Sequence, residues 1–160
     1  MALAADDVGT IYALWNAGSV RGGPQRIYFA SSTNGGESWS EKVEVSNAPP
    51  RVEHCFPAIT AGRAGDVRVA WMDTRMVDEQ NRPLWNTFYR SSTNGGATWS
   101  SESHLPGPVR GYDYILSRGF LFPFGNLFSI GIDNLGTTHV VWGEGRNYKS
   151  PGSIWYARGR

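Results

Sequence analysis

Three segments of the chain repeat one pattern of apolar and polar positions. Residues 2–15, 58–71 and 129–142 align without a gap, and in each the eighth position is glycine and the last is tryptophan. Two short apolar runs flank the glycine, which is the signature of a β-hairpin with a tight turn. The pattern therefore predicts three hairpins of the same kind. The shared residues are Gly9, Gly65 and Gly136, and Trp15, Trp71 and Trp142.

A third, aromatic-rich strand is predicted after each hairpin, beyond a variable polar loop. In the first two repeats a nearly identical turn and a fourth strand follow, whereas the third repeat reaches Arg160 where its turn would begin. The third strands are residues 27–31, 87–91 and 154–158; the turns are residues 31–40 and 91–100; the fourth strands are residues 41–45 and, more weakly, 101–105.

Four antiparallel strands in each repeating unit are typical of β-propeller blades. A blade cannot bury both of its faces alone, so neighbouring blades must stack. A β-sandwich of about eleven strands is the alternative, but it gives no reason for glycine and tryptophan at fixed places in each repeat. We therefore predict an all-β chain of about three blades, half of a six-bladed ring: residues 1–48, residues 49–106, and residues 107–160 without an outer strand.

The composition agrees with this fold class and limits the classes of binding partner to be expected. The chain has 160 residues, 20 glycines, 7 tryptophans and 18% charged residues, which suits short strands and tight turns. Its 15 basic and 14 acidic residues give a net charge of +1, so no overall field favours nucleic acid or an anionic membrane. No membrane-spanning apolar run and no signal-peptide pattern occurs, so the sequence leaves the compartment unknown.

The two turns carry a motif with a mechanical rationale. An asparagine side chain can bond amides of its own turn, and paired glycines permit positive φ. The tryptophan can then fold back as an apolar plug beneath the hairpin. The motif residues are Ser32, Asn34, Gly36 and Trp39 in the first copy, and Ser92, Asn94, Gly96 and Trp99 in the second.

These two turns resemble the Asp-box (BNR repeat) motif, Ser-x-Asp-x-Gly-x-Thr-Trp, of the sialidase superfamily, with asparagine in place of aspartate. In that family the boxes are structural and lie away from the active face, and the propellers have six blades. The resemblance implies a piece of a larger propeller, completed by other blades of a parent chain or by a second copy in a homodimer. Many relatives are secreted. The Arg-Ile-Pro element of active sialidases has no counterpart here; Arg82 begins only an Arg-Pro-Leu sequence inside a loop.

The loops at the rim opposite the boxes are the expected functional region. They comprise residues 15–25, 47–57, 72–85, 105–124 and 143–153, which are rich in arginine, carboxylate and tyrosine. The second and third repeats place an acid and an arginine at matching positions, Asp73 with Arg75 and Glu144 with Arg146.

A sialidase-like mechanism requires arginines for a substrate carboxylate, a tyrosine nucleophile activated by a glutamate, and a carboxylic acid for the leaving group. On residue type and loop position, Asp73, Glu144, Tyr112 and Tyr114 are the catalytic candidates. Candidates for substrate binding are Arg51, Arg75, Arg118 and Arg146, together with Trp85, which is expected to be exposed and able to stack on sugar rings.

Each candidate also has a structural interpretation. Acid–arginine pairs at strand ends commonly form ion pairs that tie blades together. Cys55, the single cysteine, excludes an internal disulfide and is expected to be buried and inert beside His54. No metal site and no cofactor is expected, because His104 and His139 lie too far apart in sequence to indicate one.

Three functions remain open at this point. The first is a sialidase-like propeller unit that recognises carbohydrate at the loop rim. The second is a sialidase-type exo-glycoside hydrolase that is active once the ring is complete. The third is a structural or protein-interaction propeller fragment, because a propeller fold does not fix function.

Overall fold

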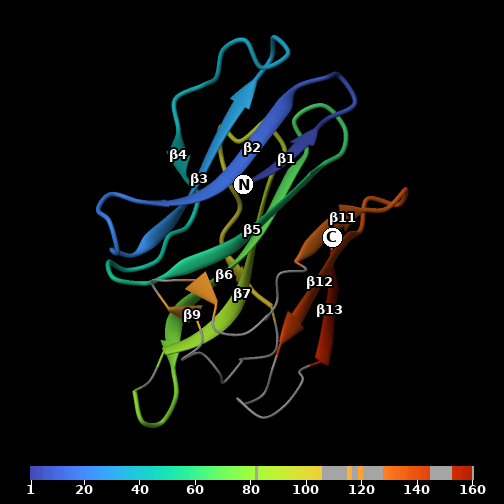
Figure 1. Ribbon diagram of the computed structural model, residues 1–160. Coiled ribbons are helices and arrows are strands. Elements are labelled where there is room, and N and C mark those ends of the chain that lie inside the picture. The colour runs from blue at the N-terminus through green and yellow to red at the C-terminus, as the bar shows by residue number, and fades with distance from the viewer. Residues whose placement is uncertain (82, 106–114, 117–118, 121–127, 145–152, 160) are drawn as a thin grey trace.

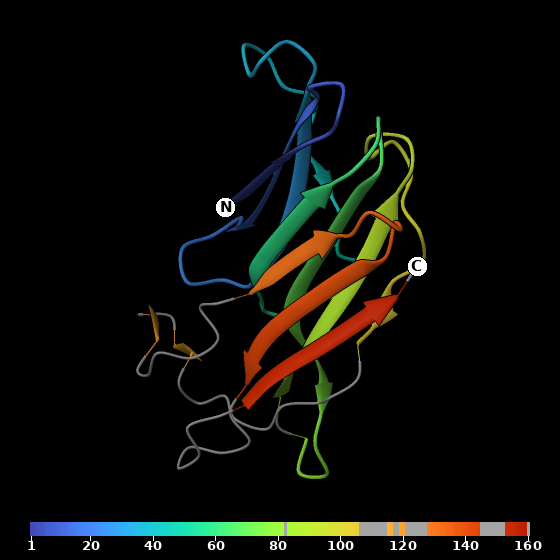
Figure 2. The ribbon, with the colours of Figure 1, turned by 90° about the vertical axis from the view of Figure 1, so that its right-hand side faces the viewer.

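The computed structural model describes residues 1–81, 83–105, 115–116, 119–120, 128–144 and 153–159. All regular structure in these residues is β, arranged as two four-stranded antiparallel sheets, one three-stranded sheet and one two-stranded sheet. Each of the three larger sheets is a blade, and the blades stack face to face (Figures 1 and 2). The prediction of an all-β fold built from propeller blades is confirmed.

Blade one is a meander in the order β1-β2-β3-β4. Its strands are β1 (Ala2–Ala5), β2 (Ile11–Gly18), β3 (Gln25–Ser32) and β4 (Val43–Glu44). Gly9 has φ +88° in the turn between β1 and β2, a conformation that an L side chain would strain. The predicted hairpin is therefore present, although the fourth strand is shorter than the predicted residues 41–45.

Blade two repeats this order with longer strands. They are β5 (His54–Ala61), β6 (Val67–Val77), β7 (Pro83–Ser92) and β8 (Ser103–His104). The register shifts between Cys55 and Ala58 on β5, and between Asp73 and Met76 on β6. Such bulges re-aim side chains at the end of a sheet.

Blade three contains three strands in the described residues, in the order β11-β12-β13. They are β11 (Ser129–Ile132), β12 (Thr138–Glu144) and β13 (Ser153–Gly159), and the two-stranded sheet is β9 (Ile115–Leu116) with β10 (Gly119–Phe120). The predicted third hairpin and third aromatic strand are thus observed. The predicted blade boundaries after residues 48 and 106 remain predictions.

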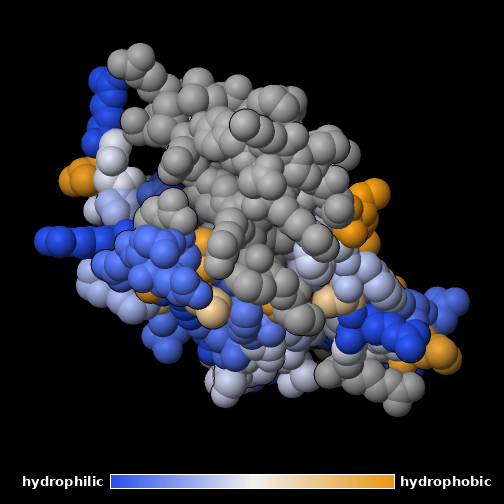
Figure 3. Space-filling view, turned by 90° about the horizontal axis from the view of Figure 1, so that it is seen from below, coloured by the Kyte–Doolittle hydropathy of each residue, from blue (hydrophilic) through white to orange (hydrophobic). Residues whose placement is uncertain are grey.

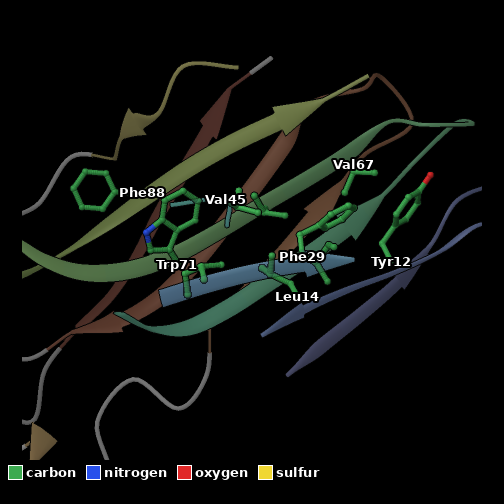
Figure 4. Close-up of a cluster of buried hydrophobic side chains, with 10 residues drawn as sticks. Tyr12, Leu14, Phe29, Val45, Val67, Trp71 and Phe88 are labelled. Carbon is green, nitrogen blue, oxygen red and sulfur yellow. The ribbon is translucent and has the colours of Figure 1, made fainter. Parts of the chain in front are cut away.

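The main core lies between blades one and two. Leu14, Phe29 and Val45 of blade one meet Val69 and Trp71 of blade two in one buried apolar cluster (Figure 4). Burying side chains of this size stabilises the fold by about 1.5–3 kcal/mol each. The stacking of these two blades is therefore a hydrophobic core shared between two sheets.

A smaller core lies between blades two and three. Ala70 of blade two packs with Val140 and Trp142 of blade three, and Leu105 and Trp155 lie at its margin. Among the described residues, no blade precedes blade one and none follows blade three.

The two motif-bearing turns have the same internal geometry. We call residues 31–40 the first outer turn and residues 91–100 the second outer turn. In the second, the Gly96 amide donates to Ser92 Oγ (2.9 Å) and the Thr98 amide to Asn94 Oδ1 (2.9 Å). In the first, Gly36 and Ser38 make the same bonds to Ser32 and Asn34. The predicted asparagine–amide bonding is present in both copies.

The two turn tryptophans have different surroundings. Trp99 packs edge-on against Phe29 of blade one, with ring centroids 5.1 Å apart. Trp39 remains 44% exposed, so the predicted apolar plug is wrong for the first copy. The reason is that the plug packs on the preceding blade, and no described blade precedes blade one.

Candidate functional site

The loop end of the molecule is the end opposite the two outer turns. It carries the β2–β3 turn, the connection of residues 45–53 between blades one and two, and the β6–β7 turn (Figures 1 and 2). Figure 3 looks onto this end, where the coloured surface around the grey residues is mainly hydrophilic. This end is therefore the candidate site for a polar ligand.

Asp73 and Arg75 form a closed ion pair at the loop end of β6. The Arg75 guanidinium donates to both Asp73 carboxylate oxygens at 2.5–3.0 Å, and the Arg75 amide donates to Oδ1 at 3.1 Å. Asp73 Oδ2 also accepts the Trp71 indole N–H at 3.0 Å, and the Asp73 side chain is 0% exposed. The acceptor sites of Asp73 face donors of the protein. Asp73 and Arg75 therefore form the structural ion pair that the sequence left open as the alternative to a role in catalysis or binding.

Glu102 extends this pair to the outer edge of blade two and back to the interblade connection. It accepts from the Arg75 guanidinium, and its second oxygen accepts the Asn47 amide at 2.6 Å. The Arg75 guanidinium also lies 3.9 Å from the centroid of the Phe88 ring, a cation–π geometry. Arg75 thus holds β6, β7 and the start of the connection in one arrangement.

His54 is buried behind the ion pair. Its Nδ1 lies 2.8 Å from the Gln25 carbonyl oxygen and 3.0 Å from that of Val52, so Nδ1 carries the proton. Nε2 lies 3.6 Å from Asp73 Oδ2 and has no hydrogen-bond partner among the described residues. Burial lowers the pKa of His54 and outweighs the attraction of Asp73. The imidazole is therefore held neutral.

Cys55 next to it fits the inert role expected from the sequence. Burial, and then the nearby Glu53 and Asp73 charges, raise the pKa of the Cys55 thiol well above its usual range. Thiolate is the reactive form, so this environment suppresses nucleophilic chemistry.

The connection between blades one and two is braced by side chains on both sides. Arg26 donates to the Ala48 carbonyl at 2.6 Å and to the Pro49 carbonyl at 2.9 Å. Glu102 holds the Asn47 amide, and His54 holds the Val52 carbonyl. These contacts fix both ends of a short turn at residues 49–52, of which residues 49–51 are exposed and Val52 is buried.

Arg51 is presented at the tip of this braced turn. Its backbone has φ +73°, an uncommon conformation for a residue with a side chain, and it is exposed. Its guanidinium forms no ion pair with any side chain in the described part of the chain. Backbone strain of this kind persists where the surrounding structure imposes it, and it is concentrated at functional sites.

Glu53 follows on the same turn and is half-buried. Both of its carboxylate oxygens lie 3.3 Å from the Gln25 amide nitrogen, which donates to them. Burial raises the pKa of Glu53, and this hydrogen bond offsets only part of the effect. An exposed arginine and a carboxyl with a raised pKa therefore lie two residues apart.

The structure unites some of the predicted site residues and not others. Asp73 and Arg75 lie together, and Arg51 lies on the neighbouring connection. Trp85 was expected to be an exposed aromatic, and that is wrong: it is 3% exposed, because β7 begins at Pro83 and carries it into the blade. Glu144 is the last residue of β12, opposite Ser153. Tyr112, Tyr114, Arg118 and Arg146 lie outside the described residues.

Glu102 and Arg26, which brace the candidate site, are residues that the sequence interpretation missed. Glu102 lies in a weak fourth-strand pattern, and Arg26 precedes an apolar strand, so neither stands out in the sequence. Arg26 could have been noticed because it lies at the start of β3 on the side of the loop rim, whereas Glu102 follows the second outer turn and gave no such signal.

No cofactor site is identified from the described residues. Within them, no three histidine, cysteine, aspartate or glutamate side chains are grouped as metal ligands would be. None of the described structure is a helix long and apolar enough to cross a membrane.

Comparison with known proteins shows the fold. No protein-family model and no curated protein sequence matches this chain. Among solved structures, a family PL25 ulvan lyase bound to a glucuronate–rhamnose 3-sulfate oligosaccharide superimposes over 99% of this chain and 40% of its own, with TM-score 0.61 and 14% identity.

Two arabinan-degrading enzymes give similar results. The Penicillium chrysogenum α-L-arabinanase complexed with arabinobiose is matched over 94% of this chain and 41% of its own, with TM-score 0.59 and 12% identity. The GH93 α-L-arabinofuranosidase of Fusarium graminearum with arabinobiose is matched over 94% and 41%, with TM-score 0.58 and 13% identity.

The chain therefore spans about 40% of the length of these structures. At such low identity the likeness concerns the fold alone. The described residues have the architecture of a partial β-propeller, with two four-stranded blades and a third blade of three strands.

Proposed function

We propose that this chain is a sialidase-like, Asp-box propeller unit that recognises carbohydrate at its loop end. The observation that carries the proposal is the braced turn of residues 49–52, which presents Arg51 in a strained, exposed conformation. In support, solved structures of the same fold are enzymes described with bound oligosaccharides.

An acidic sugar is the ligand class that this chemistry favours. A guanidinium meets a carboxylate or sulfate through two parallel hydrogen bonds, which lysine cannot reproduce. The chain contains 13 arginines and only 2 lysines. The ulvan lyase of the same fold is described with a sugar that carries both a uronate and a sulfate.

The other candidate residues take different roles in this proposal. Arg51 contacts the ligand, and Arg118 and Arg146 are further candidates, because the sequence assigns them to loops of the same rim. Arg75 is a positioning residue, because Asp73 and Glu102 already engage its guanidinium. Asp73 is likewise a positioning residue, because it is buried and closed on Arg75. Tyr112, Tyr114 and Glu144 are retained as catalytic candidates only for the second function below.

A sialidase-type glycoside hydrolase is the second candidate, and Glu53 favours it. A leaving group in glycoside hydrolysis is protonated by a carboxylic acid whose pKa is raised. Burial raises the pKa of Glu53 two residues from an exposed arginine. This candidate predicts turnover of a fluorogenic sialoside, lost in Glu53→Gln while the fold persists.

Two arginine variants test the binding proposal. Arg51→Ala removes the presented guanidinium, and Arg63→Ala, in the β5–β6 turn at the opposite end, makes the same charge change as a matched control. Calorimetric titration with an acidic oligosaccharide should show affinity reduced about tenfold in Arg51→Ala and unchanged in Arg63→Ala. Arg51→Lys should resemble Arg51→Ala, because the bidentate contact is lost.

Two results would reject carbohydrate binding at this end. One is the absence of binding by folded wild-type chain to acidic and neutral glycans alike, which would favour the structural or protein-interaction alternative. The other is an equal loss of affinity in Arg51→Ala and Arg63→Ala, which would indicate only a general effect of net charge.

A further inference from the structure

The two outer turns contain the only Asn-Gly sequences of the chain, Asn34-Gly35 and Asn94-Gly95. Asparagine is most prone to cyclise when glycine follows it, because glycine has no Cβ to shield its backbone nitrogen. That nitrogen attacks the side-chain amide carbon of the asparagine, ammonia leaves, and a succinimide ring forms. The same chemistry is thus available at two positions, one of them in the loop between β3 and β4 at the top of Figure 1.

The side-chain amide carbon is activated in the same way in both turns. Asn34 Oδ1 accepts the Ser32 hydroxyl at 2.9 Å and the Ser38 amide at 3.0 Å, and Asn34 Nδ2 donates to Ser38 Oγ at 2.8 Å. Asn94 makes the three corresponding bonds at 2.8–2.9 Å. Two donors on the amide oxygen stabilise the negative charge that develops there when a nucleophile attacks the carbon.

The backbone nitrogen of the following glycine differs between the two turns. The Gly95 amide donates to the Gly65 carbonyl in the β5–β6 turn at 2.9 Å, and a Cβ at Gly65 would lie 3.1 Å from the Gly95 nitrogen. Among the described residues, the Gly35 amide has no acceptor, and a Cβ at Gly9, which aligns with Gly65, would meet no atom within 4 Å. Each pair of glycines lies within one blade, so this difference does not depend on which blades flank the stack.

A hydrogen bond on the glycine nitrogen opposes cyclisation in two ways. The reactive form of the nitrogen is the deprotonated amide, and an N–H that is bound to a carbonyl loses its proton less readily. Attack also requires the nitrogen to rotate toward the asparagine side chain, which breaks the bond and leaves a polar group unpaired. The backbone angles are nearly equal, with φ +71° at Gly35 and +68° at Gly95, so the hydrogen bond and the packing around it distinguish the two turns.

We propose that the first outer turn is a site of intramolecular deamidation at Asn34, and that Asn94 in the second outer turn is protected from it. The Gly35 nitrogen bonds to the Asn34 side-chain carbon, the bond from that carbon to Nδ2 breaks, and Nδ2 leaves as ammonia with the proton of the Gly35 amide. Water then opens the succinimide at either carbonyl and yields aspartate or isoaspartate. One water is consumed and one ammonia is released, and no group is oxidised or reduced.

The two products change the turn differently. Aspartate keeps an oxygen in the place of Oδ1, so the Ser32 hydroxyl and the Ser38 amide retain their acceptor while the turn gains a negative charge. Isoaspartate transfers a methylene group from the side chain into the backbone, which displaces that oxygen and breaks these bonds. Deamidation therefore alters the charge and the shape of one outer turn, at the end of the molecule opposite the loop-end site.

The test follows both asparagines in one sample of folded, unmodified chain. Tryptic peptides 27–42 and 91–110 each contain one Asn-Gly sequence, so mass spectrometry after timed incubation at mildly alkaline pH measures the two conversions separately. We expect Asn34 to convert at least about tenfold faster than Asn94, because one hydrogen bond and its packing raise the barrier at Asn94. Isoaspartate should accompany aspartate, and the rate should rise with pH, because the succinimide route produces the first and requires a deprotonated amide.

The denatured chain is the internal control. Both sites share the sequence Ser-Thr-Asn-Gly-Gly, so their rates should become nearly equal once denaturant removes the Gly95–Gly65 bond. Gly35→Ala shields the attacking nitrogen and should slow conversion of Asn34 in both folded and denatured chain. Gly36→Ala is the matched variant, since it also strains the first outer turn, at φ +93°, but leaves the Gly35 nitrogen unshielded and should convert at least as fast as wild type.

Several results would overturn the proposal. Equal conversion of the two asparagines in the folded chain, or faster conversion of Asn94, would contradict protection by the Gly65 carbonyl. A rate difference that persists in denaturant would assign the effect to sequence and not to structure. Aspartate without isoaspartate would indicate direct hydrolysis in place of attack by the Gly35 nitrogen. None of these measurements involves a sugar, so they stand or fall independently of carbohydrate binding at the loop end.

Discussion

The two blade–blade interfaces are built on the same repeat but filled differently. At the first interface, Leu14 and Ile27 are large apolar side chains that pack onto blade two. The aligned residues of blade two, which face blade three, are Ala70 and Thr87. The first interface is therefore a continuous apolar core sealed by Trp99, whereas the second is thinner and contains a hollow.

Polar contacts take over at the outer-turn end of the second interface. Arg68 occupies the position that Tyr12 occupies in blade one, and it donates to the Gly136 carbonyl at 2.8 Å and to Thr138 Oγ1 at 2.6 Å. Asp66 holds the same guanidinium at 2.9–3.0 Å. Directional bonds of this kind orient blade three but stabilise less than the burial of large apolar side chains.

The comparison teaches that the first interface depends on both of its blades and on the second outer turn, whose Trp99 covers Phe29. Blade one thus gains part of its stability from the outer turn of the next blade in the chain. Four substitutions test this difference between the two interfaces.

The largest effect is expected for Leu14→Ala, at the centre of the first interface. It leaves a cavity in a fully buried position and should cost about 3 kcal/mol of unfolding free energy. Val141→Ala is the matched control, since Val141 is the aligned residue on the open face of blade three and should cost less than about 1 kcal/mol. Denaturant unfolding measures both, and equal losses would contradict the difference between a covered and an open face.

The next effect is the loss of the tryptophan plug in Trp99→Ala. Trp99 is partly buried against Phe29, so its removal should cost about 2 kcal/mol. Trp39→Ala removes the same residue from the same turn motif where no described blade covers it, and should change stability by about 0.5 kcal/mol or less. If both variants lowered the thermal unfolding midpoint equally, the tryptophan would stabilise its own turn and not the contact between blades.

Tyr12→Phe is expected to have a smaller effect at the edge of the first interface. The Tyr12 hydroxyl donates to Asp6 Oδ2 at 2.7 Å, and the same oxygen accepts the Gly65 amide of blade two at 3.0 Å. Loss of one charge-assisted bond should cost about 1.5 kcal/mol. Burial and Asp6 raise the pKa of Tyr12 to about 12, so wild-type stability should also fall between pH 10 and 12, because only the unfolded chain loses the proton there. Tyr12→Phe should lack that alkaline loss in a pH series of unfolding midpoints.

The smallest expected effect is the contribution of His54 to the loss of stability at acid pH. Its folded pKa lies below the usual value, so its contribution is complete above about pH 6.5 and declines as the pH falls below that value, where the unfolded chain takes up the proton. Burial likewise lowers the pKa of His104. His54→Gln should therefore reduce, but not abolish, the drop in unfolding free energy between pH 7 and 5. An unchanged pH profile would contradict a neutral, buried His54.

Much of the fold could be predicted from the sequence, because its determinants are local and repeated. Gly65 and Gly136 both adopt φ +77° in the turns where the alignment placed them. Trp71 and Trp142 are buried at the predicted strand positions, but Trp15 is only half-buried, because its face of blade one is open. Whether a repeated residue is covered depends on the neighbouring blade, which the repeat pattern alone does not reveal.

The candidate site could be predicted only in part. Loop position picked out Arg51, Asp73 and Arg75, yet the closure of Asp73 on Arg75 depends on the bulge in β6 and on Glu102. Trp85 was misassigned because its sequence neighbours are polar, whereas β7 extends further into the loop end than the sequence indicates. Contacts between distant strands determine which of these polar residues are available to a ligand.

The most direct test of the unequal interfaces is native-state hydrogen exchange of the unliganded chain, resolved by strand. Amides of β2 and β6 at the first interface should exchange together and most slowly, and those of β12 and β13 should exchange faster through local opening of blade three. Equal protection of β6 and β12, or slower exchange of β12, would contradict the claim that only the first interface is a complete core.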